Sequence, residues 1–181
     1  ALVENSPYFE PAEKTSLTSV ITTRYNFVAA PPILKPLPNV INKGNFLVEW
    51  YIKAHAAGYI LELASNPEFT ESTLYRVNNT AYKPATSFEL TGLEPGKAYY
   101  LRLKARNFSL SSLESPWTDT ISIIDKTFID NLGNLIDYKD GLIIKITDSS
   151  GTASIYNYSK DAAGNSVYKI VTTEGETRRY A

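Results

Sequence analysis

The sequence has no cysteine, no methionine and a single histidine, His55, among its 181 residues. Without cysteine there are no disulfides, thiolate metal sites or cysteine nucleophiles. Neither readily oxidised sulfur side chain is present, which suits an oxidising exterior. One histidine cannot supply a histidine-based metal site or a serine–histidine pair with its orienting acid. We therefore predict no metal, no cofactor and no catalytic residue, and we interpret His55 as a solvated loop residue.

The sequence also lacks long apolar runs and basic clusters. No apolar run reaches the roughly 18 residues of a bilayer-spanning helix, and no positively charged start followed by an apolar stretch marks a signal peptide. The 18 basic and 19 acidic residues leave a formal net charge of -1. Binding to phosphates requires clustered lysine and arginine, and the densest cluster is Arg178–Arg179. We expect neither a nucleic-acid partner nor membrane insertion.

The acidic residues do not form a recognisable catalytic pair. A glycosidase needs two carboxylates that converge on one bond, whereas short polar side chains in turns bond to the backbone. We interpret the acidic residues of the C-terminal region as turn residues: Asp137, Asp140, Asp148, Asp161 and Glu174. The segment from Asp130 to Asn134 has oxygen ligands near a glycine but lacks the closing glutamate of a calcium loop. Calcium there is the lesser alternative, and the chain is predicted not to be an enzyme.

Tyrosine is abundant, with thirteen residues, and apolar residues recur at every second position. Residues 46–50, 59–63 and 99–105 each present one apolar face, as a half-buried antiparallel strand requires. Proline and glycine separate these runs, for example at Pro31–Pro32 and Pro95–Gly96. Short strands at this spacing predict an all-β sandwich.

Residues 31–124 resemble a fibronectin type III domain. The resemblance rests on the opening prolines, on Trp50 in the second strand, on residues 58–62 in the third, and on the corner motif Leu-x-Pro-Gly-x-x-Tyr at residues 93–99. It implies an immunoglobulin-like sandwich with a tyrosine that turns back to bond to the backbone. The structural core that it implies includes Trp50, Tyr59, Leu93 and Tyr99. No Arg-Gly-Asp follows Asn107, so integrin binding is not implied.

Residues 125–181 contain a 24-residue repeat. Lys145–Ile146, Gly151 and Tyr156 recur as Lys169–Ile170, Gly175 and Tyr180. Each unit is interpreted as strand, glycine-containing turn and strand, so we predict a small C-terminal antiparallel β-hairpin region. Residues 156–165 resemble YD repeats of the RHS type, and the terminus resembles the C-terminal signal domain of type IX secretion substrates. Both resemblances imply a protein outside the cytoplasm.

Two further segments are candidate contact sites. Residues 1–30 are predicted to be extended with one strand over 17–28, whose apolar face is formed by Ile21, Tyr25 and Phe27. This strand is expected to pair within the chain, with a preceding domain and insertion into a neighbouring copy as alternatives. The loop after Asn107 carries Phe108, Leu110 and Leu113, which either contact a partner or pack against the C-terminal region.

These observations favour a non-catalytic structural or binding module that is secreted or lies on a bacterial cell surface. Its partners would be a protein, a cell-surface glycan or further domains of the same polypeptide. The alternatives are an accessory fragment of a secreted carbohydrate-active enzyme and the subunit of a surface filament assembled by strand exchange. More 24-residue repeats beyond the chain would favour the module, and a neighbouring catalytic domain would favour the enzyme fragment.

Overall fold

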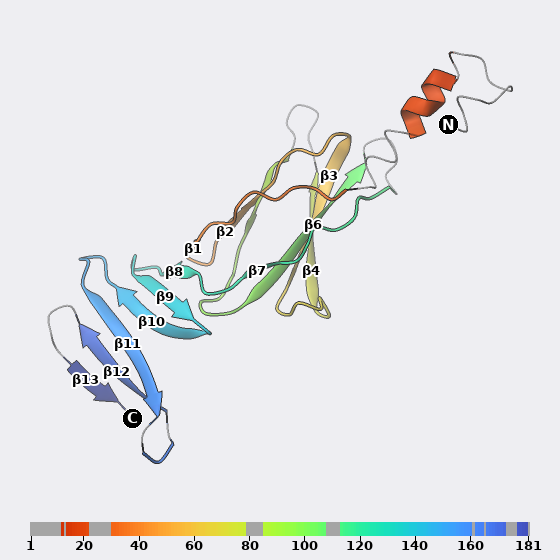
Figure 1. Cartoon of the computed structure of the whole chain (residues 1–181). Coiled ribbons are helices and arrows are strands. Elements are labelled where there is room, and N and C mark those ends of the chain that lie inside the picture. Colours follow the sequence, from red (N-terminus) through yellow and green to blue (C-terminus); the bar gives the residue numbers. More distant parts are fainter. Residues whose placement is uncertain are drawn as a thin grey trace.

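The computed structural model describes residues 12, 14–21, 30–78, 85–107, 113–160, 162–164, 166–172 and 177–180, the last range for its backbone only. The strands run from β1 to β13 and form three sheets, and one helix precedes them (Figure 1). This all-β architecture confirms the predicted fold class.

The sandwich is built from two sheets. A two-stranded sheet pairs β2 with β5, and a four-stranded sheet has the order β4-β3-β6-β7. Every pair in both sheets is antiparallel. The strands are β2 (Phe46–Glu49), β3 (Ala56–Ala64), β4 (Ser72–Asn78), β5 (Ser87–Leu90), β6 (Tyr99–Asn107) and β7 (Ile121–Ile123).

The core lies between these two sheets and follows from the period of two. Alternate residues of β2 and β6 are buried, because successive side chains of a strand point to opposite faces. Trp50 and Tyr59 are fully buried with ring centroids 5.1 Å apart. Both polar tips are satisfied: Trp50 Nε1 donates to the Ala85 carbonyl at 3.0 Å, and Tyr59 Oη accepts from the Lys53 amide at 2.9 Å.

The corner before β6 has the geometry that the motif implies. Leu93 is buried, and Tyr99 packs against the core. The Tyr99 hydroxyl accepts a hydrogen bond from the Glu94 amide at 2.9 Å. Gly96 has a φ of +72°, which an L side chain adopts only with strain. The corner therefore requires both the tyrosine and the glycine.

The third sheet has seven strands in the order β1-β8-β9-β10-β11-β12-β13. Its first strand belongs to the segment that resembles a fibronectin domain, and it pairs in parallel with β8. The strands are β1 (Val40–Asn42), β8 (Thr127–Ile129), β9 (Leu135–Lys139), β10 (Leu142–Thr147), β11 (Ala153–Lys160), β12 (Ser166–Thr172) and β13 (Thr177–Tyr180). The C-terminal strands are thus hydrogen-bonded to the sandwich through β1.

Tight turns connect the C-terminal hairpins. Asp140 and Gly141, between β9 and β10, have φ values of 51° and 76°, as a two-residue type I′ hairpin requires. Between β10 and β11, Asp148 Oδ1 accepts from the amides of Ser150 and Thr152, both at 2.9 Å. The β10–β11 pair Lys145↔Ile155 and the β12–β13 pair Lys169↔Arg179 differ by 24 residues on both strands.

The N-terminal segment differs from its prediction. Residues 14–21 are helical, whereas a strand was expected over 17–28. A strand needs a neighbour for its backbone groups, while a helix satisfies them internally, and no strand ladder in the described part of the chain includes these residues. Leu17, Val20 and Ile21 have the i, i+3, i+4 spacing of one helix face, and Ile21 is 53% exposed. The predicted burial of Ile21 is therefore wrong; Tyr25 and Phe27 lie outside the described residues.

Candidate docking surface

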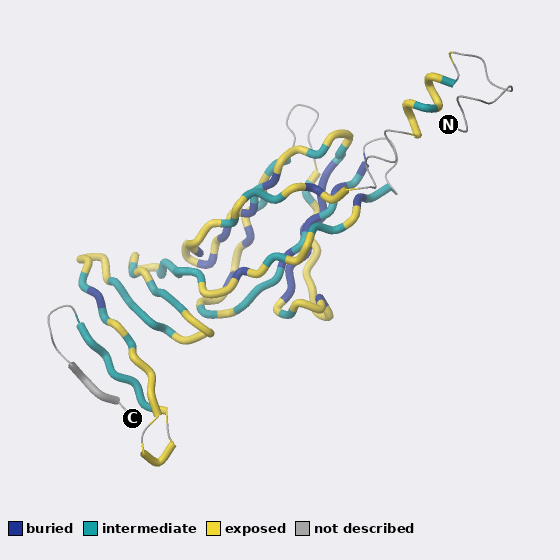
Figure 2. The backbone as a smooth tube through the Cα atoms, in the orientation of Figure 1, coloured by how far each residue is buried: buried dark blue, intermediate teal, exposed yellow. Residues whose placement is uncertain are grey.

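The C-terminal sheet is a single layer. Dark blue, buried residues gather in the sandwich, whereas β9–β12 are mostly of intermediate or full exposure (Figure 2). Among the described strand residues from β8 onward, only Ala153 is buried. A β-sheet is normally stabilised by burying one face against another layer. Residues of β9–β12 therefore stay partly exposed on both faces of the sheet.

Strand register assigns side chains to each face, because directly paired residues lie on the same side. Ile136 pairs with Ile146, Tyr138 with Ile143, Tyr156 with Ile170 and Tyr158 with Tyr168. Ile146 pairs with Ser154, which lies two residues before Tyr156. We call this side the tyrosine face and define it as Ile136, Tyr138, Ile143, Ile146, Tyr156, Tyr158, Tyr168 and Ile170.

The opposite side, the charged face, has a different composition. Asp137 pairs with Lys145, and Asn157 pairs with Lys169. By the same register, the charged face comprises Leu135, Asp137, Lys139, Leu142, Lys145, Thr147, Ala153, Ile155, Asn157, Ser159, Val167, Lys169 and Val171. This side mixes charged, polar and apolar residues, whereas the tyrosine face is mainly isoleucine and tyrosine, with Lys160 paired to Ser166 and Arg178 paired to Ile170 at its edge.

The sandwich covers the near end of the tyrosine face. Phe128, which pairs with Ile136, packs against the sandwich core. A Cβ placed on Gly96 would lie 2.9 Å from the Tyr138 ring and 3.3 Å from the Gly141 carbonyl oxygen. The Pro95–Gly96 corner therefore sits directly on Tyr138, at a distance that only glycine permits.

Hydrogen bonds reinforce this junction. The Asp140 amide donates to Oδ1 of Asp125, which lies between β7 and β8, at 2.9 Å. The Lys43 amide donates to the Ile129 carbonyl at 2.8 Å. Sandwich and C-terminal sheet are thus connected by main-chain bonds, side-chain bonds and apolar packing.

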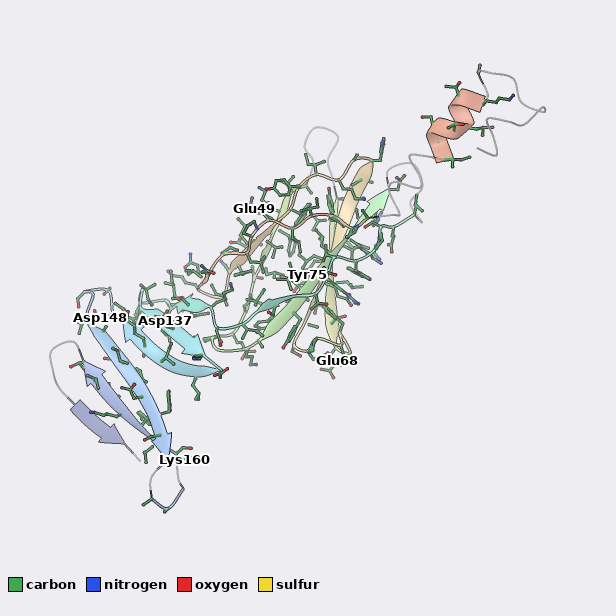
Figure 3. All side chains as sticks on the ribbon, viewed as in Figure 1. Glu49, Glu68, Tyr75, Asp137, Asp148 and Lys160 are labelled. Carbon is green, nitrogen blue, oxygen red and sulfur yellow. The ribbon has the colours of Figure 1, made fainter. Side chains whose placement is uncertain are left out.

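A groove of about 430 Å³ lies at the far end of the sheet and is lined by residues from both faces. Tyr158, Lys160, Ser166 and Tyr168 belong to the side of the tyrosine face, and Leu142, Ser159 and Val167 belong to the opposite side. The rings of Tyr158 and Tyr168 have centroids 6.1 Å apart, and the Tyr158 hydroxyl donates to the Ile143 carbonyl at 2.8 Å. Lys160 lies at the end of β11 away from the Asp148 turn (Figure 3). This end combines aromatic surface with a polar rim, as ligand and partner sites do.

The outer face of the sandwich carries a ladder of cations and rings. The Arg102 guanidinium lies 4.1 Å from the Phe69 ring centroid and 4.7 Å from that of Trp117, and Lys104 Nζ lies 4.4 Å from the latter. Arg102 also forms a 2.6 Å ion pair with Glu62, and Lys104 pairs with Glu114. Each cation is matched by a carboxylate and a ring, so we assign the ladder to stabilising the sandwich.

The ionisation of the Glu62 carboxyl reflects its contacts in this ladder. Burial would raise the pKa of the Glu62 carboxyl, but hydrogen bonds from Ser72 and Arg102 and the charges of Arg102 and Lys104 outweigh it. The net pKa is lowered, and the carboxylate stays ionised. Its two oxygens accept from Ser72 Oγ and Arg102 Nε, both at 2.6 Å.

The predicted contact loop is described only at its end. Leu113 packs against the sandwich core rather than against the C-terminal sheet, and its carbonyl accepts from the Asn107 amide at 2.9 Å. Phe108 and Leu110 lie outside the described residues. Leu113, the described member of the predicted contact loop, therefore belongs to the sandwich.

The acidic loops use their carboxylates internally. Asp130 Oδ1 accepts from the amides of Leu132 and Asn134, at 2.8 and 2.9 Å. The pKa of Asp130 is lowered by backbone and side-chain hydrogen bonds from Asn134, which outweigh some desolvation. The pKa of Asp148 is also lowered, and the largest cause is the hydrogen bond from the Ser150 side chain. His55 is exposed in a turn with a φ of 62°.

Within the described ranges, no three acidic, histidine or cysteine side chains cluster as metal ligands would. Of the helical residues described, none belongs to a helix long and apolar enough to cross a membrane.

The tyrosine face was missed from the sequence, although a signal for it was present. Ser154, Tyr156, Tyr158 and Lys160 alternate with Ile155, Asn157 and Ser159, and this alternation already marks an aromatic side. What the alternation lacked was the register that brings Tyr168 opposite Tyr158.

No protein-family model matches the sequence, and no curated protein matches it. Among solved structures, a human fibronectin type III domain is 11% identical with a TM-score of 0.45, over 62% of this chain and 83% of its own. A myokine structure is 14% identical with a TM-score of 0.42, over 52% and 95%. A β-1,2-glucanase from Parabacteroides distasonis is 19% identical with a TM-score of 0.40, over 54% of this chain and 13% of the glucanase. The strand order, the core and the tyrosine corner of the chain itself define its fibronectin type III-like fold.

Proposed function

We propose that this chain is a non-catalytic module, on a secreted or cell-surface polypeptide, that holds an open β-sheet in a fixed position relative to a sandwich. The sandwich supplies the stable core, and the C-terminal sheet supplies the surface that is presented. A spacer of this kind must transmit orientation, so its junction has to be stiff. The proposal therefore depends on the junction more than on either part.

The observation that carries the proposal is the pairing of β1 with β8. A flexible linker makes few contacts across a domain boundary, whereas here a strand of the sandwich segment is also the first strand of the seven-stranded sheet. Phe128 in the core and Tyr138 against Gly96 add apolar contact on the same side. Rotation about this junction would break all three together.

The stiffness can be measured as a distance distribution between two spin labels. The absence of cysteine allows unique labelling of a Glu71→Cys/Asn157→Cys variant, with one exposed residue on the sandwich and one on β11. A Glu71→Cys/Glu89→Cys variant, labelled at two exposed residues of the sandwich, is the matched control. Excess unlabelled protein removes distances between molecules.

We expect one distance across the junction, with a distribution as narrow as that of the control. A broad or multiple distribution across the junction, beside a narrow control, would contradict the proposed spacer function.

A further inference from the structure

The C-terminal sheet has a short seam between β10 and β11. β10 pairs with β9 from its first residue to its last, and β11 forms seven register pairs with β12. Between β10 and β11, three pairs form, from Lys145↔Ile155 to Thr147↔Ala153. Figure 1 shows these two strands close together at the turn that joins them and diverging toward their other ends. The seam therefore connects two parts of the sheet, the inner strands β8–β10 and the outer strands β11–β13.

The bulge in β10 gives a physical reason for this divergence. The register with β9 shifts between Ile143 and Lys145, and a bulge bends its strand and increases the local twist. Leu142 and Ile143 stay paired with β9, whose Tyr138 ring lies against the Gly96 corner. The inner strands thus follow the sandwich, and the outer strands leave it.

A side-chain hydrogen bond crosses the open end of the seam. The Tyr158 hydroxyl donates to the Ile143 carbonyl at 2.8 Å. On its other side, the Tyr158 ring lies against the ring of Tyr168, its register partner on β12, with centroids 6.1 Å apart. The groove beside it is lined by Leu142, the first residue of β10. The hydroxyl therefore reaches from an outer strand to the main chain of an inner strand, beyond the paired residues of the seam.

We propose that Tyr158 is the positioning residue that fixes the angle of the outer strands relative to the rest of the molecule. The inference rests on the proposed function, in which the sheet keeps one orientation, and it adds a second joint beyond the β1–β8 junction. The three pairs of the seam span about 10 Å of β11, whose eight residues extend over about 27 Å at roughly 3.4 Å per residue. Pairing at one end alone would let β11 pivot about the turn. The bond from Tyr158 to Ile143 holds the other end.

The expected effect of this bond is modest but measurable. A hydrogen bond contributes little net stability when water competes for both partners, and Tyr158 is 42% exposed. Its loss should make local opening of the seam roughly two- to tenfold more frequent. The sandwich is held by its own core, so its strands should not open more often.

Two matched variants isolate the hydroxyl. Tyr158→Phe removes the bond to the Ile143 carbonyl and keeps the ring beside Tyr168. Tyr138→Phe makes the same chemical change on the same face of β9, where the hydroxyl has no hydrogen-bond partner in the described part of the chain. Melting temperature and far-ultraviolet circular dichroism show that both variants have folded.

Hydrogen exchange of the full chain, followed by NMR, measures the opening of the seam. The amides of the three β10–β11 pairs should exchange roughly two- to tenfold faster in Tyr158→Phe than in the wild type. Tyr138→Phe should leave them unchanged. The amides of β3 and β6 in the sandwich are the internal reference.

Spin-label distances show which part of the molecule loses its orientation. The Glu71→Cys/Asn157→Cys pair spans both the junction and the seam, and Asn157 lies on the face opposite Tyr158. A Glu71→Cys/Leu132→Cys pair spans the junction alone, because Leu132 lies between β8 and β9, where it is 79% exposed. Adding Tyr158→Phe should broaden the first distribution and leave the second unchanged.

The proposal is overturned if Tyr158→Phe matches Tyr138→Phe in either measurement. Equal broadening of both label pairs would also overturn it, because the hydroxyl would then act on the junction and not on the seam. A Glu71→Cys/Leu132→Cys distribution that is already broad without Tyr158→Phe would instead contradict the stiff junction of the proposed function. In that case the exchange of the seam amides would still decide the role of Tyr158.

Discussion

Replacing Gly96 by alanine tests the junction at a single methyl group. Gly96 has a φ of +72°, and its added Cβ would lie 2.9 Å from two carbon atoms of the Tyr138 ring. Alanine in the left-handed region costs roughly 1–2 kcal/mol. Forcing an extra methyl group into a packed contact costs typically about 1–3 kcal/mol more.

Gly92 is a close control. Its φ is +76°, and no atom lies within 4 Å of an added Cβ. Gly92→Ala therefore carries the backbone strain without the contact. The difference between the two variants isolates the contact with the C-terminal sheet, at Tyr138 and the Gly141 carbonyl oxygen, and we expect Gly96→Ala to be the less stable by about 1–3 kcal/mol. For a chain of this size, each kcal/mol lowers the melting temperature by about 2–4 °C.

Thermal and chemical denaturation measure the difference, and a double-mutant cycle with Tyr138→Ala locates it. With the ring removed, alanine at position 96 should exceed the cost of alanine at position 92 only by its 3.3 Å approach to the Gly141 carbonyl oxygen. Hydrogen exchange should also show faster opening of β9 and β10 in Gly96→Ala than in Gly92→Ala. Equal destabilisation by both single variants would refute the reasoning, because the methyl group would then have met no resistance from the C-terminal sheet.

Three further outcomes are expected. Trp50→Ala should cost about 3–5 kcal/mol of the roughly 5–10 kcal/mol that holds a small domain together, because Trp50 is fully buried and bonded to the Ala85 carbonyl; an unchanged melting temperature would contradict the assigned core. The pKa of Glu62 is lowered in the folded protein, so on acidification the unfolded chain binds this proton first, near pH 4.3. Stability should therefore decline as the pH falls from about 4.3 through the lower folded-state pKa. Glu62→Gln should flatten this part of the plot of melting temperature against pH, and identical plots for the two proteins would show that the Glu62 ion pair does not contribute to it. A chelator should leave the melting temperature unchanged, because the Asp130 carboxylate accepts hydrogen bonds from its own loop; a clear drop would instead indicate a metal that binds the native state.

The sequence by itself determined the sandwich. The alternation around Phe46 and Leu101 specifies which side of β2 and β6 is buried, since the side-chain period of a strand is two. The same alternation predicted a half-buried strand over residues 59–63, whereas β3 is buried on both sides from Gly58 to Ala64 because it is a central strand of its sheet. Local sequence motifs predicted that Trp50 and the Leu93–Tyr99 corner lie at the core, and the structure places both of them there. The turn at Asp148 was likewise predicted, because its hydrogen bonds span four residues at most.

Tertiary structure decided the rest. Alternation shows that Tyr156 and Tyr158 share a side, but a shift of one residue would exchange the two faces, and the register shift between Ile143 and Lys145 cannot be read from composition. The parallel pairing of β1 with β8 joins segments that are distant along the chain, and no local preference encodes it. Residues 14–21 also show that local sequence was not sufficient. The pattern at Ile21 is compatible with the start of a strand or the end of a helix, and with no described neighbouring strand the helix satisfies its own backbone hydrogen bonds. Local patterns therefore determined the strands around Trp50 and Tyr99 and the C-terminal hairpins, while the contacts between distant segments decided which face of the C-terminal sheet meets the sandwich.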